Sequence, residues 1–452
     1  MDEGEGLDVF VVALDDFHLR ELRSIRDAER YRFHGLLSTE EAVTAKRYDV
    51  DALLEHATEQ LERCEDGPDG LVGHWDFPTT SLVPILGRRF GLRVPPLEAT
   101  LRCEHKYWSR LAQARVVPEL VPGFALVDPF AEPALADVDL DPPFWIKPVK
   151  AFSSYLGFHV RDETDFAEAM RQTREGLHVM AEPFDRVLEE AGPMGDVPAV
   201  NGWHCIAEQL VDGRQCTLEG YVEDGETVIY GVVDSVRADN RSSFLRYEYP
   251  STLAAPIQRR MAEATRSVME EIGYDHGCFN IEFFVAEDES LKLLELNPRM
   301  SKSHCPLFRM VEGASHHEAA VEIAVGRTPA FPRHAGEARC AAKCMIRRFE
   351  DGVVEHVADE ASLQRWEEAH PGVHVEPRVE PGQRLSTLPP QDQDSYSFET
   401  AVVFVGGEDR AQLARRFQAA LEVLDLRYAD GRGDSAAASA PDAPSASRRR
   451  SA

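Results

Sequence analysis

The chain has 452 residues, of which 43% are hydrophobic, so it can bury a large core and divide into roughly two to four domains. Its formal net charge is −30, which opposes binding to nucleic acid and to anionic lipid, and we expect neither as a partner. The sequence contains no run approaching the roughly 18 apolar residues that span a membrane, and it opens on acidic residues rather than on the basic segment of a secretory signal. We therefore expect a cytoplasmic protein.

Eight cysteines are spread along the chain without a CxxC pair. Several of them lie in apolar stretches, as buried reduced thiols do. We expect neither disulfides nor a structural zinc site.

The first 97 residues are predicted to form a small α/β domain. The expected elements are strands at 7–14 and 71–73 and helices at 19–28, 50–64 and 81–91, the last of which is capped by Gly91. This alternation of strands and helices predicts a parallel sheet.

Residues 98–335 are predicted to form a second domain in which strands dominate. Pro95 and Pro96 mark the linker before it, and a helix carrying Lys106 opens it. The further expected elements are strands at 144–149, 156–160, 205–213, 216–236 and 279–297, and helices at 164–176 and 256–272. Residues 183–201, which contain three prolines, are expected to form a loop.

The rest of the chain is predicted to be a third unit, at 336–430, and a tail. Strands at 340–349 and 397–407 and a helix at 409–424 predict a small α+β domain. Residues 431–452 are almost entirely Ala, Ser, Pro, Asp and Arg and cannot bury enough apolar surface to fold, so we expect a disordered tail. The fold class expected for the whole chain is α/β (α+β).

The most informative segment is residues 279–299, with the sequence FNIEFFVAEDESLKLLELNPR. Two apolar halves separated by a polar break predict a β-hairpin. We expect Asp288 and Glu289 to form a two-residue turn, which places Glu282 directly opposite Glu295. Opposed residues have Cβ atoms roughly 4.5–5.5 Å apart, so two carboxylates this close repel unless a cation lies between them.

The same register places Asn280 opposite Asn297. Residues Glu295, Asn297 and Arg299 then alternate onto one face of the hairpin. Two carboxylates and an amide oxygen are the hard ligands that suit Mg²⁺, and a guanidinium suits the phosphate that accompanies it. We therefore expect Glu282, Glu295 and Asn297 to be metal ligands. An ordinary hairpin with its charges facing solvent is the alternative.

Lysine is scarce, with 7 Lys against 42 Arg. The lysines near candidate anion sites are Lys106, Lys147, Lys150 and Lys302. Lys147 lies within an apolar strand, where a lysine either reaches out to solvent or meets a fixed anion. The loop that follows contains Ser153, Ser154 and Gly157, whose backbone N–H groups and hydroxyls suit phosphate oxygens.

Several known motifs are absent from the sequence. It has no GxxxxGK[ST] and no strand-linked GxGxxG, which argues against P-loop and Rossmann phosphate binding, and no GxSxG or HExxH. We expect His316, His317 and Glu318 to begin a helix with satisfied side chains rather than to bind a metal.

Four segments taken in order resemble the ATP-grasp superfamily. They are HKYWSRL with Lys106, WIKPV with Lys147, AEQLVDGRQCTLEG, and the hairpin ending in LLELNPR. The resemblance covers roughly residues 98–330. It implies an ATP-grasp fold with a nucleotide between two antiparallel sheets, an N-terminal α/β pre-ATP-grasp domain, and a small C-terminal α+β domain.

The resemblance also implies ATP and Mg²⁺ (or Mn²⁺) as cofactors and assigns roles to residues. The nucleotide-binding residues it implies are Lys106, Lys147, Ser153, Ser154, Glu208, Gln209, Leu210, Val211 and Gln215. Glu208 would begin the hinge segment, whose backbone would read adenine at 209–211. Gln215 stands where the family often has a glutamate for the ribose hydroxyls. Arg299 and Lys147 would be catalytic and steady the transferred phosphoryl group.

Within the superfamily, NPRMSKSH resembles the large subunit of carbamoyl-phosphate synthetase, and the last unit is similar to the C-terminal domain of L-amino-acid ligases. Biotin carboxylases follow the shared Glu, Asn and Arg with Gln-Val-Glu, whereas this chain has Met300, Ser301 and Lys302. The resemblance implies an ATP-dependent, ADP-forming carboxylate–amine ligase that acts through an acyl phosphate. A biotin-carboxylase-like enzyme that makes carboxyphosphate from bicarbonate and a non-catalytic ATP-binding protein are the alternatives.

The substrates implied are a small-molecule carboxylate and an amine. Loops at 177–201 and 300–318 would line the acceptor pocket. Lys302 and Arg309 would pair with a substrate carboxylate or have ordinary surface roles, and the position of Lys343 is left open. Dimers are common in the superfamily, so the resemblance leaves open a monomer or a homodimer.

Overall fold

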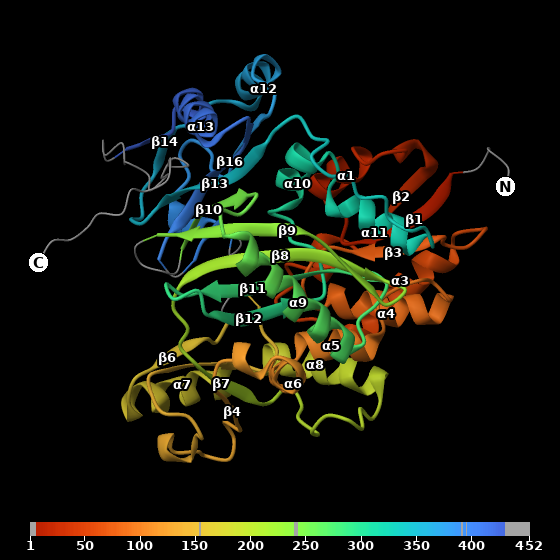
Figure 1. Ribbon diagram of the computed structural model, residues 1–452, viewed down its shortest axis with the longest axis vertical. Helices are drawn as coiled ribbons and strands as arrows, with labels where there is room; N and C mark the ends of the chain where they lie inside the picture. Colours follow the sequence, from red (N-terminus) through yellow and green to blue (C-terminus); the bar gives the residue numbers. More distant parts are fainter. Residues whose placement is uncertain (1–5, 153–154, 239–242, 390–391, 395, 430–452) are drawn as a thin grey trace, which may run out of the picture.

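The computed structural model describes residues 6–152, 155–238, 243–389, 392–394 and 396–429. The predicted mixed class is confirmed: parallel strands alternate with helices at the start of the chain, and antiparallel sheets dominate the rest (Figure 1). The tail predicted at 431–452 lies outside the described residues. No helix in the described part of the chain is long and apolar enough to cross a membrane.

A three-stranded parallel sheet opens the chain, in the order β2-β1-β3. Its elements are β1 (Leu7–Val12), β2 (Tyr31–Leu36) and β3 (Gly70–Gly73), with the helices α1 (Asp16–Arg23), α2 (Thr39–Ala42), α3 (Val50–Glu62) and α4 (Thr79–Phe90). The parallel sheet is therefore as predicted, although β2 was missed because its exposed and half-buried middle gives no apolar run. The carboxyl ends of β1 and β3 meet at one edge, which brings Asp15 and Asp76 to the same side of the sheet.

The second sheet is antiparallel, in the order β4-β7-β5-β6, and lies below the others in Figure 1. Its strands are β4 (Phe124–Val127), β5 (Phe144–Pro148), β6 (Phe158–Val160) and β7 (Cys205–Gln209). The helices of this region are α5 (Leu97–Glu104), α6 (Lys106–Val116), α7 (Glu163–Gly176) and α8 (His178–Ala191).

The loop predicted at 183–201 is wrong in its first half, because α8 continues through Pro183 to Ala191. Met180, Phe184 and Val187 recur at helical spacing and are buried where α8 meets α3 and α5. Burial of each such side chain contributes about 2 kcal/mol, which together outweighs the roughly 3 kcal/mol cost of a proline inside a helix.

The largest sheet has eight strands, in the order β12-β11-β8-β9-β10-β13-β16-β15. They are β8 (Arg214–Glu223), β9 (Glu226–Arg237), β10 (Phe244–Tyr249), β11 (Gly277–Val285), β12 (Leu291–Asn297), β13 (Cys340–Arg348), β15 (Val373–Pro377) and β16 (Phe398–Gly407). Because β13 pairs with β10, this sheet continues across residue 336, where the third unit is expected to begin.

The remaining elements surround this sheet. They are α9 (Ala255–Ile272), α10 (Cys305–Glu312), α11 (His316–Ala324), α12 (Glu360–Ala369) and α13 (Arg410–Leu424), and a two-stranded sheet of β14 (Val354–His356) and β17 (Arg427–Tyr428). In α9 the side chains of Ile257, Met261 and Val268 recur on one face and are buried with the apolar residues of β8 and β11.

The turn of the β11–β12 hairpin differs from the prediction. The backbone N–H of Ala286 donates to the carbonyl of Ser290 at 2.9 Å, so three residues form the turn instead of two. Glu289 occupies the left-handed region with φ of 63°, as the last residue of a three-residue turn often does.

A one-residue bulge at Leu294 then restores the predicted register. Phe283 pairs with Leu293, whereas Glu282 pairs with Glu295. The bulge also reverses the alternation of side chains along β12, so that Leu293 and Leu296 both lie in the core. The turn is one residue longer than predicted, and the bulge adds one residue to β12. The two differences cancel, so Glu282 faces Glu295 as predicted.

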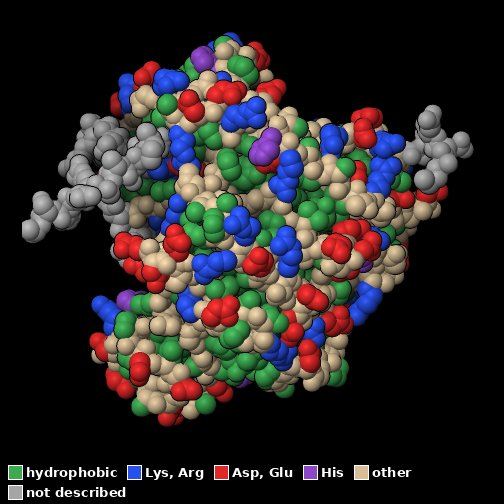
Figure 2. Space-filling view, in the orientation of Figure 1, with side chains coloured by type: hydrophobic (Ala, Val, Ile, Leu, Met, Phe, Trp, Pro, Cys, Tyr) green, Lys and Arg blue, Asp and Glu red, His purple; other side chains and the backbone are tan. Residues whose placement is uncertain are grey.

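The acidic charge is not gathered into one patch on the face shown in Figure 2, where Asp and Glu side chains are interspersed with Lys and Arg. Acidic side chains also pair with basic ones: Arg186 contacts Asp51 at 2.8 Å and Glu190 at 2.6 Å.

Candidate active site

Glu282 and Glu295 face each other across the hairpin. They are paired in the register of β11 and β12, and both line a cavity of about 490 Å³. The other face of the hairpin presents Phe283 and Leu293 to the core beneath α9. Burial of these apolar side chains therefore holds the two carboxylates on the cavity side.

The two carboxyl groups have opposite pKa shifts. Burial, and next the charge of Glu295, raise the pKa of Glu282 to about 7. Burial acts in the same direction on Glu295, but the charges of Lys106 and Lys147 outweigh it and lower the pKa of Glu295 to about 2. The pair therefore carries less than two full negative charges near neutral pH, and a cation between them would favour ionisation of both.

Asn297 lies next to the pair and lines the same cavity. Its amide N–H donates to Asn280 Oδ1 at 3.0 Å, and Asn280 donates to the carbonyl of Arg299 at 2.9 Å. The donor group of Asn297 is thus used within the hairpin, and its oxygen is the atom that would face a cation.

Two of the predicted anion-binding lysines hold carboxylates at the cavity wall. Lys106 Nζ lies 2.9 Å from Glu295 Oε1 and donates to the carbonyl of Ala151 at 2.7 Å. Lys150 Nζ donates to Glu104 Oε1 at 2.9 Å. Lys106 and Lys150 both line the cavity, and so do the two glutamates with which they pair.

Lys147 lies on β5, where its neighbours Ile146 and Phe144 are buried in the sheet core. Its Nζ lies 2.7 Å from Glu208 Oε2, and Arg110 Nε lies 2.6 Å from Glu208 Oε1. Burial raises the pKa of Glu208, but the charges of Arg110 and Lys147 outweigh it and bring that pKa to about 2. Glu208 is therefore an ionised anchor for two buried cations.

The proposed hinge residues connect the two antiparallel sheets. Glu208 and Gln209 end β7, and residues 210–213 lead into β8. Gln209 N donates to the carbonyl of Gly123 at 2.8 Å, while Leu210 is exposed and Val211 is half-buried. The segment is in the position expected of a hinge, and its role in reading adenine stays a prediction.

Both polar atoms of the Gln215 side chain are hydrogen-bonded within the sheet. Its Nε2 donates to Glu282 Oε2 at 2.6 Å, and its Oε1 accepts from Arg237 Nε at 2.7 Å. Gln215 therefore positions a carboxylate of the hairpin, and a contact with ribose stays a prediction.

Ser153 and Ser154 of the expected phosphate loop lie outside the described residues. Gly157 follows them, and a Cβ there would come within 2.7 Å of the Trp145 indole. Close packing against Trp145 thus accounts for this glycine.

Arg299 connects the hairpin to the N-terminal sheet. Its Nη2 donates to Asp76 Oδ2 at 2.7 Å, and Asp76 follows β3 by three residues. Burial raises the pKa of Asp76, but the charges of Arg299 and Lys150 outweigh it and lower that pKa. The guanidinium is therefore held at the cavity edge by an ionised carboxylate.

The residues considered for the acceptor pocket do not lie together in the structure. Lys302 Nζ pairs with Asp15 Oδ2 at 2.8 Å, and Arg309 pairs with Glu21 at 3.1 Å. Lys343, in contrast, lines the cavity and donates to Ser303 Oγ at 2.9 Å.

Sequence reasoning missed Asp76, Glu104 and Arg110. Arg110 lies four residues after Lys106 on α6, so helical spacing alone places both on one face. Asp76 follows the carboxyl end of a parallel strand, where polar groups of a site often gather. Glu104 ends an otherwise apolar helix face, and nothing in its spacing marks it.

Comparison with known proteins fits this geometry. Residues 140–306, which include both strands of the hairpin, match the family model described as "ATP-grasp domain". This chain contains an ATP-grasp domain. The matched residues lie within the segment at roughly 98–330 that the sequence motifs had indicated.

Solved structures extend the similarity to the whole ATP-grasp fold. An L-amino acid ligase from Bacillus licheniformis is 13% identical with a TM-score of 0.68, over 94% of this chain and 98% of that chain. A biotin carboxylase from Campylobacter jejuni is 17% identical with a TM-score of 0.61, over 93% of this chain and 92% of that chain. At these identities the likeness establishes the fold of the domain and its flanking parts.

Among curated proteins, the large chain of carbamoyl phosphate synthase from Kocuria rhizophila is 31% identical over 129 residues. The match covers 28% of this chain and 11% of that enzyme. The match thus covers only a small part of that relative's length.

Proposed function

We propose that this chain is an ATP-dependent carboxylate–amine ligase that forms an amide and releases ADP and phosphate. The observation that carries the proposal is the opposed pair Glu282 and Glu295 on a cavity wall that also presents Lys106 and Arg299. Oxygen donors for a divalent cation and nitrogen donors for phosphate converge there, as a nucleotide substrate requires. The ATP-grasp domain supports the same conclusion.

The donor set fits Mg²⁺ or Mn²⁺, because Glu282, Glu295 and Asn297 offer only oxygen ligands. A bound ion would supply charge neutralisation of the phosphates. Lys106 and Lys147 would bind phosphate oxygens, and Glu295 and Glu208 already hold their ammonium groups in place.

In the proposed reaction, a carboxylate oxygen of the acid bonds to the γ-phosphorus while the bond from phosphorus to ADP breaks. The amine nitrogen then bonds to the acyl carbon while the carbon–oxygen bond to phosphate breaks, and the amine releases a proton. Arg299 and Lys147 steady the transferred group by charge, and the rest of the site positions the reactants.

The wall of the cavity contributed by β13 supports an anionic acid substrate. Lys343 is half-buried there, and its burial lowers its pKa. Arg347 also lines the cavity, where its Nη2 donates to Glu399 Oε2 at 3.0 Å. A partly buried cation gains from an anionic partner, so we assign Lys343 to a carboxylate of the substrate.

The test is ADP release by the purified chain with Mg-ATP, against pooled amino acids, other carboxylates with and without amines, and bicarbonate with biotin. The assay should be run at low and high salt because the net charge is −30. Release that requires both a carboxylate and an amine supports the ligase. Release with bicarbonate alone would replace it with a biotin-carboxylase-like activity, and ATP binding without release would replace it with a non-catalytic ATP-binding role.

A further inference from the structure

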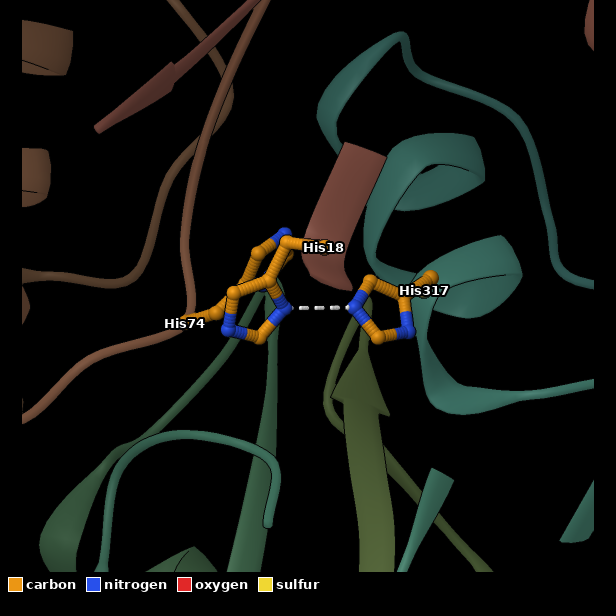
Figure 3. A group of neighbouring side chains, drawn as sticks. All are labelled: His18, His74 and His317. Atoms are coloured by element: carbon orange, nitrogen blue, oxygen red, sulfur yellow. Dashed lines mark hydrogen bonds between the residues drawn. The ribbon is translucent and has the colours of Figure 1, made fainter. Parts of the chain in front are cut away.

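Three histidines from distant parts of the chain meet beside the N-terminal sheet (Figure 3). His18 lies on α1, His74 directly follows β3, and His317 lies on α11. Their ring centroids are 4.6 Å apart for His18 and His74, 4.7 Å for His74 and His317, and 5.2 Å for His18 and His317. One ring nitrogen from each lies within 4.8 Å of the other two.

All three imidazoles are removed from water, with exposed fractions of 0% for His18, 3% for His74 and 0% for His317. Their hydrogen bonding is incomplete. His18 Nδ1 and His317 Nε2 are 2.9 Å apart, but His18 Nε2 and a ring nitrogen of His74 have no hydrogen-bond partner among the described residues. Buried polar atoms without a partner are costly, so such a group points to a missing ligand.

The protonation state suits coordination. Burial is the main cause that lowers the pKa of all three imidazoles, bringing that of His74 to about 4. The nearby ammonium of Lys302 acts in the same direction, but Asp15 pairs with it at 2.8 Å and limits its repulsion of a cation. Each ring is therefore neutral near pH 7 and has a lone pair to donate.

The spacing of the nitrogens also suits a metal. Tetrahedral zinc with Zn–N bonds of 2.0–2.1 Å places its ligand nitrogens about 3.3 Å apart. The contact between His18 and His317, at 2.9 Å, needs to open by only about 0.4 Å to reach that separation. Ser315 Oγ lies 3.4 Å from His317 Nδ1, on the side of the ring where a supporting hydrogen bond orients a ligand histidine.

We propose that His18, His74 and His317 bind a divalent transition-metal ion, with zinc as the first choice. Imidazole nitrogens suit zinc and its neighbours in the first transition row, whereas the oxygen donors of the hairpin suit Mg²⁺. The ion would join α1 and the end of β3 to α11, and so fix the N-terminal sheet against the region of the ATP-grasp domain.

The proposed site departs from two expectations from the sequence. The cysteines had led us to expect no structural zinc, but positions 18, 74 and 317 share no local spacing that a motif could reveal. The second expectation was that His316 and His317 have satisfied side chains and bind no metal. The proposed site departs from it at His317, whereas His316 Nε2 lies 3.2 Å from Glu219 Oε2.

The test begins with the full chain expressed in medium supplemented with zinc and, separately, with cobalt, so that the ion is present during folding. We expect about one ion per chain by elemental analysis and visible absorption bands of tetrahedral Co²⁺ with nitrogen ligands. His74→Gln should lower the metal content at least tenfold. The matched control is His316→Gln, which changes a fully buried histidine outside the group and should retain the ion.

Glu295→Gln separates this site from the hairpin, because it should retain the zinc or cobalt whatever its effect on ATP turnover. A folded wild-type chain without stoichiometric zinc or cobalt would overturn the proposal, as would equal metal content in His74→Gln and His316→Gln. Should His74→Gln fail to fold, the cobalt spectrum of the wild-type chain decides, and the absence of tetrahedral bands overturns the site.

Discussion

Asp76 Oδ2 accepts a hydrogen bond of 2.7 Å from Arg299 Nη2, which joins the end of a strand in the N-terminal sheet to the end of the hairpin that carries the candidate cation ligands. The two residues are far apart in the sequence, and each belongs to a different sheet region. The position of the Arg299 guanidinium at the cavity therefore depends on how the N-terminal sheet is placed relative to the hairpin.

Replacing Asp76 should reduce turnover without removing the nucleotide site. In Asp76→Asn, Arg299 loses its ionised partner and is no longer held at the cavity edge. We expect ADP release to fall roughly 10- to 100-fold, as is usual when the partner that orients a functional group is lost. Asp165→Asn, which breaks an exposed pair with Arg161, is the control and should leave the rate unchanged. Equal rates in the two variants would count against a positioning role for Asp76.

Glu295→Gln should abolish ADP release. The substitution removes one of the paired carboxylates and leaves Lys106 without its anion, so both the cation and the phosphates lose a partner. Loss of an electrostatic group at the reacting centre typically costs roughly 100- to 1000-fold in rate. The measurement is ADP release across a range of Mg²⁺ concentrations, and a variant with a near-normal rate would show that the metal assignment is wrong.

Glu208→Gln should reveal a pH-dependent contribution to stability. The folded-state pKa of Glu208 is about 2, below the ordinary value of 4.5, so its contribution is fully present above pH 4.5 and is lost as the pH falls toward 2. At pH 7 we expect the variant to be less stable by about 3 kcal/mol, because Arg110 and Lys147 lose a buried partner. Below pH 4.5 the difference should shrink by about 1.4 kcal/mol per pH unit.

Urea unfolding of the wild type and Glu208→Gln at pH 7, 5 and 3.5 measures this difference. The control is Glu168→Gln, which changes an exposed glutamate paired with Arg171 and should leave the free energy of unfolding nearly unchanged at every pH. If the loss of unfolding free energy in Glu208→Gln stays constant between pH 7 and 3.5, Glu208 is not the ionised partner of Arg110 and Lys147.

Gly213→Ala should destabilise the link between the two antiparallel sheets. Gly213 has φ of 137°, and a Cβ there would lie 2.5 Å from the carbonyl oxygen of Val285 at the end of β11. We expect a loss of about 2 kcal/mol in the free energy of unfolding, from backbone strain and overpacking. Gly225→Ala is the control, because Gly225 also has positive φ, at 78°, but its added Cβ meets nothing within 4 Å. Equal losses of stability in the two variants would show that a Cβ at position 213 does not clash with the Val285 carbonyl oxygen.

The sequence predicted the elements that repeat over several residues more successfully than those that depend on distant partners. Period-two and helical patterns indicated the hairpin, α9 and the parallel sheet at the start of the chain. The opposition of Glu282 and Glu295 was predicted for a partly wrong reason, because the turn is one residue longer than expected and the bulge at Leu294 compensates. A bulge is favoured by the burial of Leu293 and Leu296, which is decided by α9 and not by the hairpin itself.

The scarcity of lysine pointed to the right side chains, but it did not show what each one contacts. Lys106, Lys147 and Lys150 each pair with a glutamate, while Lys302 pairs with an aspartate away from the cavity. Ion pairs between residues tens to hundreds of positions apart leave no local trace in a sequence. The same reason hides the group of three histidines.

The continuity of the eight-stranded sheet affects how chains of this kind should be compared. The wall that faces the hairpin includes Lys343, Arg347 and Glu399, which all follow residue 306, where the match to the ATP-grasp domain ends. Two chains can therefore agree in every residue of that matched segment and still present different charges to the proposed acid substrate. Transplanting β13 and β16 between such chains, with the hairpin left intact, is the exchange by which substrate preference would be altered while the nucleotide chemistry is kept.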